Sequence, residues 1–93
     1  MRFARAERYR PTRTPDGAGG FTEALVGPEA VYLSVETHST GMRAICRTGS
    51  DVLPEDVIVV ADAQYRVIGW TGHHEGPVVS LEIERVERPV VPR

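Results

Sequence analysis

Histidine, cysteine and carboxylate side chains are the reactive groups in this chain. His73, His74 and Glu75 are adjacent, but neighbouring residues on a strand point in opposite directions and seldom bind one metal ion. We interpret them as part of a solvated loop. The three histidines are too scattered to suggest a Ser–His–Asp triad, and Cys46 has no adjacent base to activate its thiol. We therefore expect no metal, no cofactor and no enzymatic activity.

Two polar loops have the amino-acid composition of ligand-binding loops, but their residues are not spaced as in the known ligand-binding motifs. The carboxylates of Asp51, Glu55 and Asp56 do not follow the EF-hand pattern, so we expect a solvated loop that initiates a turn. The segment Thr14–Gly20, TPDGAGG, does not match a P-loop, and no lysine follows it. Its Pro-Asp-Gly sequence is typical of a tight reversal, and we interpret it as a mobile hairpin tip.

The charge distribution leaves two classes of partner open. The formal net charge is −2, which gives no general attraction to nucleic acid or to a membrane. Residues 1–13, however, carry five arginines against one glutamate, a local charge of +4, together with Phe3 and Tyr9. Proteins that bind single-stranded nucleic acid use this arginine-plus-aromatic composition, and so do protein–protein interfaces.

The single cysteine and the hydropathy indicate a reduced intracellular protein. Cys46 has no second cysteine for an intrachain disulfide, and we expect it to be a buried, inert thiol. No apolar run approaches the roughly 18 residues of a transmembrane helix. The charged N-terminal sequence MRFARAERYR lacks the apolar region of a signal peptide.

Apolar runs separated by turn residues predict an all-β fold. Val57–Val60, Tyr65–Trp70 and Val78–Val86 are rich in β-branched and aromatic residues, which predicts a three-stranded antiparallel meander. The last run alternates from Val79 onward, as expected of a strand with one solvated face. Residues 72–77 connect the second and third of these strands.

Four shorter segments predict the remaining strands, and these are Arg8–Arg13, Phe21–Val26, Ala30–Thr37 and Met42–Arg47. We expect Gly27 and Pro28 to separate the second from the third. The prediction is one domain over residues 1–93, a small antiparallel β-barrel or sandwich of six to seven short strands with long loops. Residues 1–6 and 88–93 are expected to form flexible arms.

The order of these elements resembles the head–tail joining family of tailed bacteriophages, the head-closure or "stopper" proteins of siphophage necks and gene-transfer agents. The order and spacing of the pieces, rather than any one of them, carry the resemblance over residues 7–87. The pieces are ERYRPTRT (Glu7–Thr14), PDGAGG (Pro15–Gly20), FTEALVGPEAVYLSVE (Phe21–Glu36), MRAICR (Met42–Arg47), DVLPEDVIVV (Asp51–Val60), AQYRVIGW (Ala63–Trp70) and SLEIERVE (Ser80–Glu87).

The resemblance implies a virion structural protein of the phage neck, assembled in the cytoplasm of the bacterial host. It would form a homo-oligomeric ring between the portal–adaptor complex and the tail-terminator or tail proteins, away from any membrane. There it would lie close to packaged DNA and help to retain it. Family members often carry a long insertion between the second and third strands, which in some helps to plug the channel. Here only Thr37–Gly41 lies between them, so ring scaffolding is a safer expectation than DNA gating.

Ring assembly requires two different complementary patches on each subunit. We hypothesise a basic patch on the first strand that pairs with an acidic patch of the neighbouring subunit. The basic residues are Arg5, Arg8, Arg10 and Arg13, and the acidic residues are Asp51, Glu55, Asp56 and Asp62. A second candidate surface, facing the lumen or a neighbour, is the loop containing Pro15, Asp16, Gly17, Gly19 and Gly20.

Two alternatives to the connector ring remain. One is another phage structural protein with a related barrel, such as a tail terminator or adaptor. The other is a small β-barrel that binds nucleic acid. Salt-dependent binding of oligonucleotides would favour the second.

Overall fold

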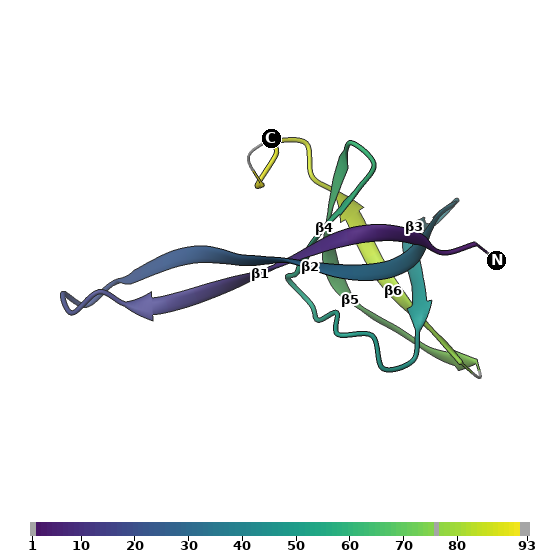
Figure 1. Cartoon of the computed structure of the whole chain (residues 1–93), viewed down its shortest axis with the longest axis horizontal. Coiled ribbons are helices and arrows are strands. Elements are labelled where there is room, and N and C mark those ends of the chain that lie inside the picture. The colour runs from purple at the N-terminus through teal and green to yellow at the C-terminus, as the bar shows by residue number, and fades with distance from the viewer. Residues whose placement is uncertain (1, 76, 92–93) are drawn as a thin grey trace.

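Six antiparallel strands close into a barrel within the residues that this computed structural model describes, 2–75 and 77–91 (Figure 1). Around the barrel they follow the order β1-β2-β3-β6-β5-β4, and β1 pairs with β4 to close it. The strands are β1 (Ala4–Pro15), β2 (Phe21–His38), β3 (Gly41–Arg47), β4 (Val57–Val60), β5 (Ala63–Glu75) and β6 (Val78–Arg85).

The predicted all-β class and the C-terminal meander are both confirmed. β4, β5 and β6 pair consecutively and antiparallel. β5 is longer than predicted, because it continues beyond Trp70 to Glu75 and pairs there with the start of β6. The connection predicted over residues 72–77 is correspondingly shorter.

A continuous β2 replaces the two strands that were predicted around Gly27 and Pro28. Arg8 of β1 lies opposite Glu29, whereas Arg10 lies opposite Val26. Two steps along β1 therefore match three steps along β2, which is the geometry of a β-bulge. A bulge tolerates both the missing N–H of proline and the φ of +154° at Gly27, so these residues bend the strand without ending it.

The barrel core consists of inward-facing side chains from the strands and from one loop. The predicted alternation of β6 holds, since Val79, Leu81 and Ile83 are buried. In β3 the inward residues are Ala44 and Cys46, while the arginines face outward. The main apolar cluster comprises Ala6, Val31, Leu33, Ala44, Cys46, Val52, Ile58, Val67, Val79, Leu81 and Ile83.

The described residues near each end of the chain contact the barrel, although residues 1–6 and 88–93 were expected to form flexible arms. At the N-terminus β1 already begins at Ala4, and Ala6 is buried. At the C-terminus Val91 is buried against Val57 and Val59. The side chain of Gln64 holds this segment, because its Oε1 accepts hydrogen bonds from the N–H groups of Val90 and Val91 and its Nε2 donates to the carbonyl of Val91.

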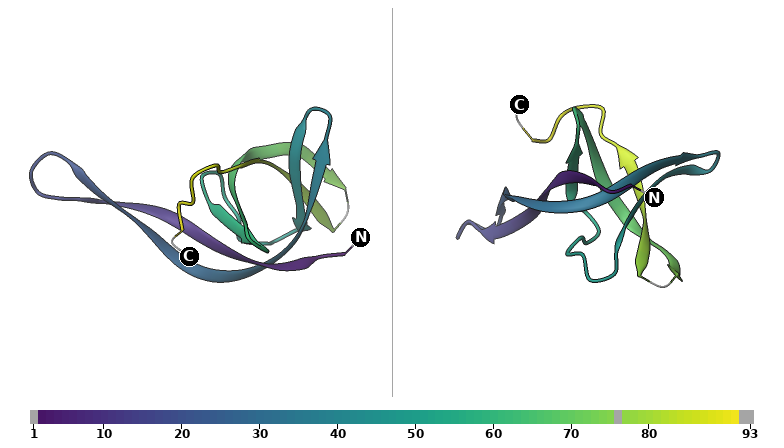
Figure 2. Two further views of the ribbon diagram at one scale, coloured as in Figure 1. Left: turned by 90° about the horizontal axis from the view of Figure 1, so that it is seen from above. Right: turned by 45° about the vertical axis from the view of Figure 1, so that its right-hand side comes forward.

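The outer part of the β1–β2 hairpin extends away from the barrel. β4 pairs with β1 at residues 7–9, and β3 pairs with β2 from Leu33 onward. Beyond these contacts the paired residues 10–15 and 21–26, with the connecting turn 16–20, form a two-stranded ribbon that we call the arm. The two views in Figure 2 show the arm projecting from the ring of strands. It accounts for the elongated dimensions of 47 × 26 × 25 Å.

Candidate interface

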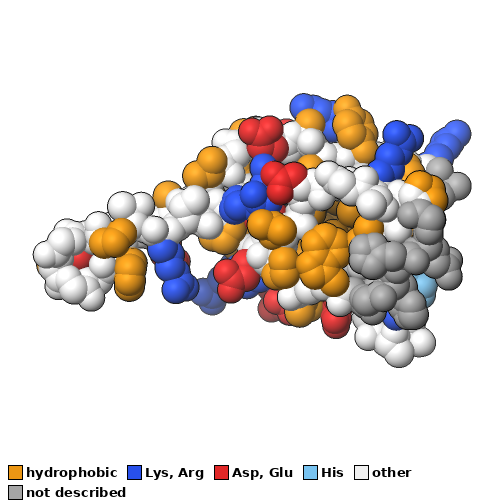
Figure 3. All heavy atoms as spheres, turned by 90° about the horizontal axis from the view of Figure 1, so that it is seen from below, with side chains coloured by type: hydrophobic (Ala, Val, Ile, Leu, Met, Phe, Trp, Pro, Cys, Tyr) orange, Lys and Arg blue, Asp and Glu red, His pale blue; other side chains and the backbone are white. Residues whose placement is uncertain are grey.

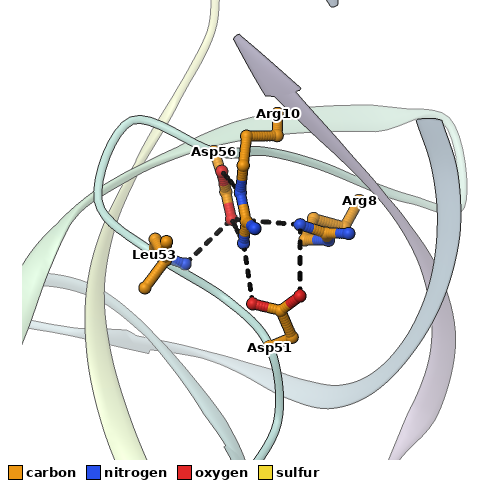
Figure 4. A network of polar contacts seen from close by, with 5 residues as sticks. All are labelled: Arg8, Arg10, Asp51, Leu53 and Asp56. Atoms are coloured by element: carbon orange, nitrogen blue, oxygen red, sulfur yellow. Dashed lines mark hydrogen bonds and ion pairs between the residues drawn. The ribbon is translucent and has the colours of Figure 1, made fainter. Parts of the chain in front are cut away.

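Two arginines of β1 and two aspartates of the β3–β4 connection meet at the base of the arm. Arg8 and Arg10 are two residues apart, and the connection brings Asp51 and Asp56 to them (Figure 4). We call Arg8, Arg10, Asp51 and Asp56 the arginine–aspartate cluster. The cluster joins the arm to the loop that enters β4.

Asp56 is the buried centre of this cluster, with 1% of its surface exposed. Arg10 donates to both of its carboxylate oxygens, from Nε to Oδ1 at 3.1 Å and from Nη2 to Oδ2 at 3.0 Å. The N–H of Leu53 also donates to Oδ2, at 2.8 Å. A bidentate, charge-assisted pair is the arrangement that best offsets the cost of burying a carboxylate.

Backbone hydrogen bonds hold the loop that carries Asp56 against β5. The N–H of Glu55 donates to the carbonyl of Val67, and the N–H of Val67 donates to the carbonyl of Asp56. Glu55 itself has a φ of +76° and an exposed side chain. The main chain of this acidic segment is therefore held against β5. Its turn and its exposed Asp51 and Glu55 agree with the expected solvated loop, whereas Asp56 is buried.

Asp51 is the exposed member of the cluster. Its Oδ1 accepts a hydrogen bond of 2.9 Å from Nη2 of Arg10, and this bond lowers the pKa of Asp51 below its ordinary value. The pKa of Arg10 is raised by its hydrogen bonds to Asp56 and, second, to Asp51. Arg10 is thus shared between a buried and an exposed carboxylate.

Arg8 is buried without hydrogen bonds from two of its nitrogens. Its side chain is 9% exposed, and Nη1 lies 3.7 Å from Asp51 and 4.0 Å from Asp56. Neither Nε nor Nη1 has a hydrogen-bond partner among the described residues. Buried guanidinium N–H groups without partners are uncommon in folded proteins. A buried donor that forms no hydrogen bond has lost its bonds to water without replacement, which costs free energy.

The cluster changes the interface expected from the sequence. Arg8 and Arg10 were expected to pair with acidic residues of a neighbouring subunit, yet they pair with Asp51 and Asp56 of their own chain. The fold brings these opposite charges together, so their ion pairs form within one chain and do not require a neighbouring subunit. Figure 3 shows basic and acidic side chains side by side near the middle of one face.

The other residues of the predicted patches are exposed. Arg5, Glu55 and Asp62 lie on the barrel surface. Arg13 lies on the arm, where its Nε donates to Glu23 at 2.8 Å. Arg13 and Glu55 line one hollow together with Glu23 and Arg66.

The predicted tip loop forms the end of the arm. The Oδ1 of Asp16 accepts hydrogen bonds from the N–H groups of Ala18 and Gly20, at 2.7 and 3.1 Å. These bonds lower the pKa of Asp16. Gly17 and Gly19 have positive φ, which glycine adopts without strain. Pro15 is the last residue of β1, and the residues of this candidate surface thus remain together at the far end of the molecule.

Apolar side chains of the arm and of β2 are exposed. Phe21 is 63% exposed and Val26 is 57% exposed. None of the described strands pairs with the outer edge of β1 beyond Tyr9, or with the outer edge of β2 before Leu33. An unpaired edge with exposed apolar side chains is a typical site for association with another chain.

A hollow of about 980 Å³ lies beside the cluster. Its lining includes Arg8 and Asp51 of the cluster, together with Tyr32 and Arg47. The guanidinium of Arg47 lies 5.6 Å from the centre of the Phe3 ring. Tyr32 and Arg47 were not predicted as site residues, because no local motif shows that the middle of β2 and the end of β3 lie near the N-terminal segment.

No group of three metal-ligating side chains occurs in the part of the chain that the structure describes. The side chains of His73, His74 and Glu75 lie outside that part. Cys46 is buried, and burial raises the pKa of its thiol, which disfavours the reactive thiolate. Among residues 2–75 and 77–91, no helix has the length and hydrophobicity required to cross a membrane.

Comparison of the chain with family models, curated proteins and solved structures found no match. The candidate sites of this barrel are the arm, the arginine–aspartate cluster and the hollow beside it.

Proposed function

We propose that this protein is a ring-forming virion structural protein of the head–tail connector. In this role it joins a portal–adaptor complex to the tail. The observation that carries the proposal is the arm, because it combines an unpaired pair of strand edges with exposed Phe21 and Val26. A ribbon of two strands is only marginally stable alone, and packing against a neighbour would bury its apolar surface.

The arm suits the head-to-tail contacts of a ring. It projects from one side of the barrel (Figure 2), so its contact surface differs from the barrel surface that a neighbouring arm would meet. Contacts of this kind generate a closed ring when the rotation between subunits closes. The subunit contact that we propose therefore uses the arm, in place of pairing between Arg8 or Arg10 and a neighbour's aspartates.

The DNA-retaining part of the expected role is proposed for the arm tip and not for the β2–β3 connection. β2 ends at His38 and β3 begins at Gly41, so this connection is a tight turn. Residues 16–20 extend farther from the barrel and can face the lumen of a ring or an adjacent subunit. Their positions in an assembled ring would distinguish these two cases.

Co-assembly with portal and adaptor proteins of a tailed bacteriophage tests the proposal. The purified proteins are mixed and imaged by electron microscopy, with the portal–adaptor complex alone as the control. A new ring of density at the end of the complex is the expected result. The absence of added density at saturating concentrations of the protein would contradict the connector role.

One observation favours a nucleic-acid-binding barrel as the second candidate. The hollow beside the cluster is lined by Arg2, Arg8 and Arg47 and by two aromatic residues, Phe3 and Tyr32. Arginine and aromatic side chains bind single strands through phosphate contacts and base stacking. Titration of a labelled oligothymidylate at several salt concentrations tests this candidate, because its affinity should fall steeply with salt.

A further inference from the structure

The two strands of the arm differ in what their outer edges offer to another strand. The N–H of Asp16 donates to the carbonyl of Gly20 at 3.1 Å and closes the hairpin. Hydrogen-bonded and non-hydrogen-bonded pairs alternate along an antiparallel ladder, so the odd-numbered residues of the arm direct their main-chain N–H and C=O groups away from the partner strand. These outward residues are Pro11, Arg13 and Pro15 of β1 and Phe21, Glu23 and Leu25 of β2.

Proline blunts the outer edge of β1. Pro11 and Pro15 have no N–H, so among the outward residues of β1 only Arg13 can donate to another strand. Proline at outward positions removes no hydrogen bond within the arm, and it protects an edge strand from unwanted pairing. The outward residues of β2 all keep their N–H groups. The edge of the arm that can accept another strand is therefore that of β2.

β5 also has an open edge, but that edge is irregular. β4 pairs with β5 only over residues 63–66. Beyond them, the pairing of β5 with β6 shifts in register between Val67 and Gly69, and again between Trp70 and His74. Bulges of this kind make an edge a poor template for another strand. Residues 21–26 of β2 pair with β1 without a shift, so the edge of β2 in the arm is the more regular of the two.

We propose that two copies of the chain dimerise by antiparallel pairing of these β2 edges, with the twofold axis at Ala24. Each copy then offers the same edge, which is an isologous contact, and the four strands form one sheet in the order β1-β2-β2-β1. Glu23 of each copy lies opposite Leu25 of the other, and both are outward residues, so these pairs exchange main-chain hydrogen bonds. The small side chain of Ala24 suits the non-hydrogen-bonded pair on the axis, where Cα atoms are about 4.5 Å apart.

The side chains along this edge are complementary to those of a second copy. Phe21, which is 63% exposed, lies opposite Gly27 of the other chain, and an aromatic ring can cover a glycine that has no side chain of its own. Glu23 is the only charged residue in the segment 21–27, and its Oε1 already accepts a 2.8 Å hydrogen bond from Nε of Arg13. The pairing therefore buries apolar surface and places no like charges directly opposite each other.

The dimer goes beyond the proposed connector role and does not require it, because the isolated chain carries both halves of the contact. It covers the edge of the arm that a neighbour in a ring would meet. Ring assembly would then require the dimer to dissociate. Experiments on the isolated protein test the dimer independently of the portal and adaptor.

Sedimentation equilibrium of the isolated protein, from micromolar to millimolar concentrations, should show a monomer–dimer equilibrium. Glu23→Pro removes one outward N–H and no hydrogen bond to β1. It should raise the dissociation constant of the dimer about tenfold or more, since each dimer loses two main-chain hydrogen bonds. The matched control Glu23→Gln removes the same carboxylate but keeps the N–H, and it should leave the constant nearly unchanged. Circular dichroism shows whether both variants fold.

Cysteine cross-linking tests the register and stays informative if Glu23→Pro does not fold. Ala24→Cys brings two thiols together across the axis, at a Cα separation that permits a disulfide. Thr12→Cys is the matched control, because Thr12 is the partner of Ala24 on β1 and its two copies would lie three strand spacings, about 14 Å, apart. Mild oxidation should give a covalent dimer of Ala24→Cys, and none of Thr12→Cys or of the wild type, whose Cys46 is buried.

Four outcomes would overturn the proposal. A monomer at every concentration would leave the β2 edge to a different protein. Species larger than a dimer would indicate a contact that does not close on itself. Equal dissociation constants for folded Glu23→Pro and Glu23→Gln would place the contact away from the β2 edge. Cross-linking of Thr12→Cys as fast as that of Ala24→Cys would contradict the twofold axis at Ala24.

Discussion

At the scale of single residues, the buried Asp56 links the first strand to the loop before β4. Its carboxylate accepts two hydrogen bonds from Arg10 and one from the N–H of Leu53. Removal of one partner from a buried ion pair leaves an uncompensated charge. The strength of the junction between arm and barrel therefore depends on this carboxylate.

Asp56→Asn is expected to lower the free energy of unfolding by about 3 kcal/mol, because it breaks a buried ion pair. This value is the lower end of the range for such changes, since Arg10 remains partly solvated. Urea unfolding followed by circular dichroism measures this change. The matched control is Glu23→Gln, which breaks the exposed Arg13–Glu23 pair and should cost less than about 1 kcal/mol. Equal effects of the two substitutions would show that the buried ion pair stabilises the fold no more than the exposed pair does.

Asp51 should make a pH-dependent contribution to stability. Its pKa is lowered by the hydrogen bond from Arg10, so the folded state binds this proton less readily than the unfolded state. The contribution is fully present above the ordinary value of 3.8 and is lost as the pH falls through the lowered pKa. The melting temperature of the wild type should exceed that of Asp51→Asn at neutral pH, and the difference should shrink below about pH 3.8. A difference that grows on acidification would contradict this sign.

The sequence indicated these four charged residues as interface candidates but not that they pair within one chain. Arg8, Arg10, Asp51 and Asp56 were all selected as interface residues on charge alone. Residues about forty positions apart in the chain, such as Arg10 and Asp51, meet because β1 and β4 are neighbours across the closure of the barrel. Composition shows opposite charges, whereas only the topology decides whether they pair within one chain or between chains.

At the scale of elements, the bulge in β2 sets where the arm leaves the barrel. A Cβ atom added to Gly27 would lie 2.6 Å from the carbonyl oxygen of Arg8 and 3.0 Å from the ring of Tyr9. Both neighbours belong to β1, so the two strands approach too closely there for any side chain. The residue is required by backbone proximity as well as by its positive φ.

Gly27→Ala should lower the free energy of unfolding by about 2 kcal/mol, because the contacting backbone must shift and the φ of +154° disfavours a side chain. Chemical denaturation measures the loss. Gly69→Ala is the matched control, since its added Cβ would meet nothing within 4 Å, and its effect should stay within about 0.5 kcal/mol. A tolerated Gly27→Ala would mean that the bulge relaxes freely.

The element pattern was largely predictable from the sequence where alternation is regular. Val79, Leu81 and Ile83 alternate with polar residues and form the buried face of β6, as predicted. Around Gly27 and Pro28 the local signal indicates a break, yet pairing with β1 on both sides of these residues keeps one strand continuous. Long-range pairing overrode the local preference, and no sequence pattern indicated it.

At the scale of the whole molecule, the arm packs on the barrel at its base, where Leu25 contacts the cluster of Val57, Val59 and Val91, and then projects beyond it. Its outer residues, from Arg13 to Phe21, are exposed apart from the partly buried Gly20. Thr12 and Ala24 are direct partners in the β1–β2 register, so an Asn-Gly turn inserted between them in place of residues 13–23 should close a shorter hairpin. This replacement removes the tip while it keeps the bulge and the arginine–aspartate cluster.

The shortened variant is expected to retain the barrel, with a free energy of unfolding within about 1 kcal/mol of the wild type, because the removed ribbon is only marginally stable by itself. Urea unfolding and circular dichroism measure this. A loss of cooperative unfolding would show that the arm is part of the folding unit.

Ring density on the portal–adaptor complex is the most direct measure of the connector proposal, when the wild type and the shortened variant are compared at equal concentration. Electron microscopy of both mixtures should show an added ring with the wild type and none, or incomplete rings, with the variant. The variant's intact barrel would assign that difference to lost subunit contacts. No ring with the wild type would contradict the connector role, and complete rings with both proteins would contradict the arm as the subunit contact.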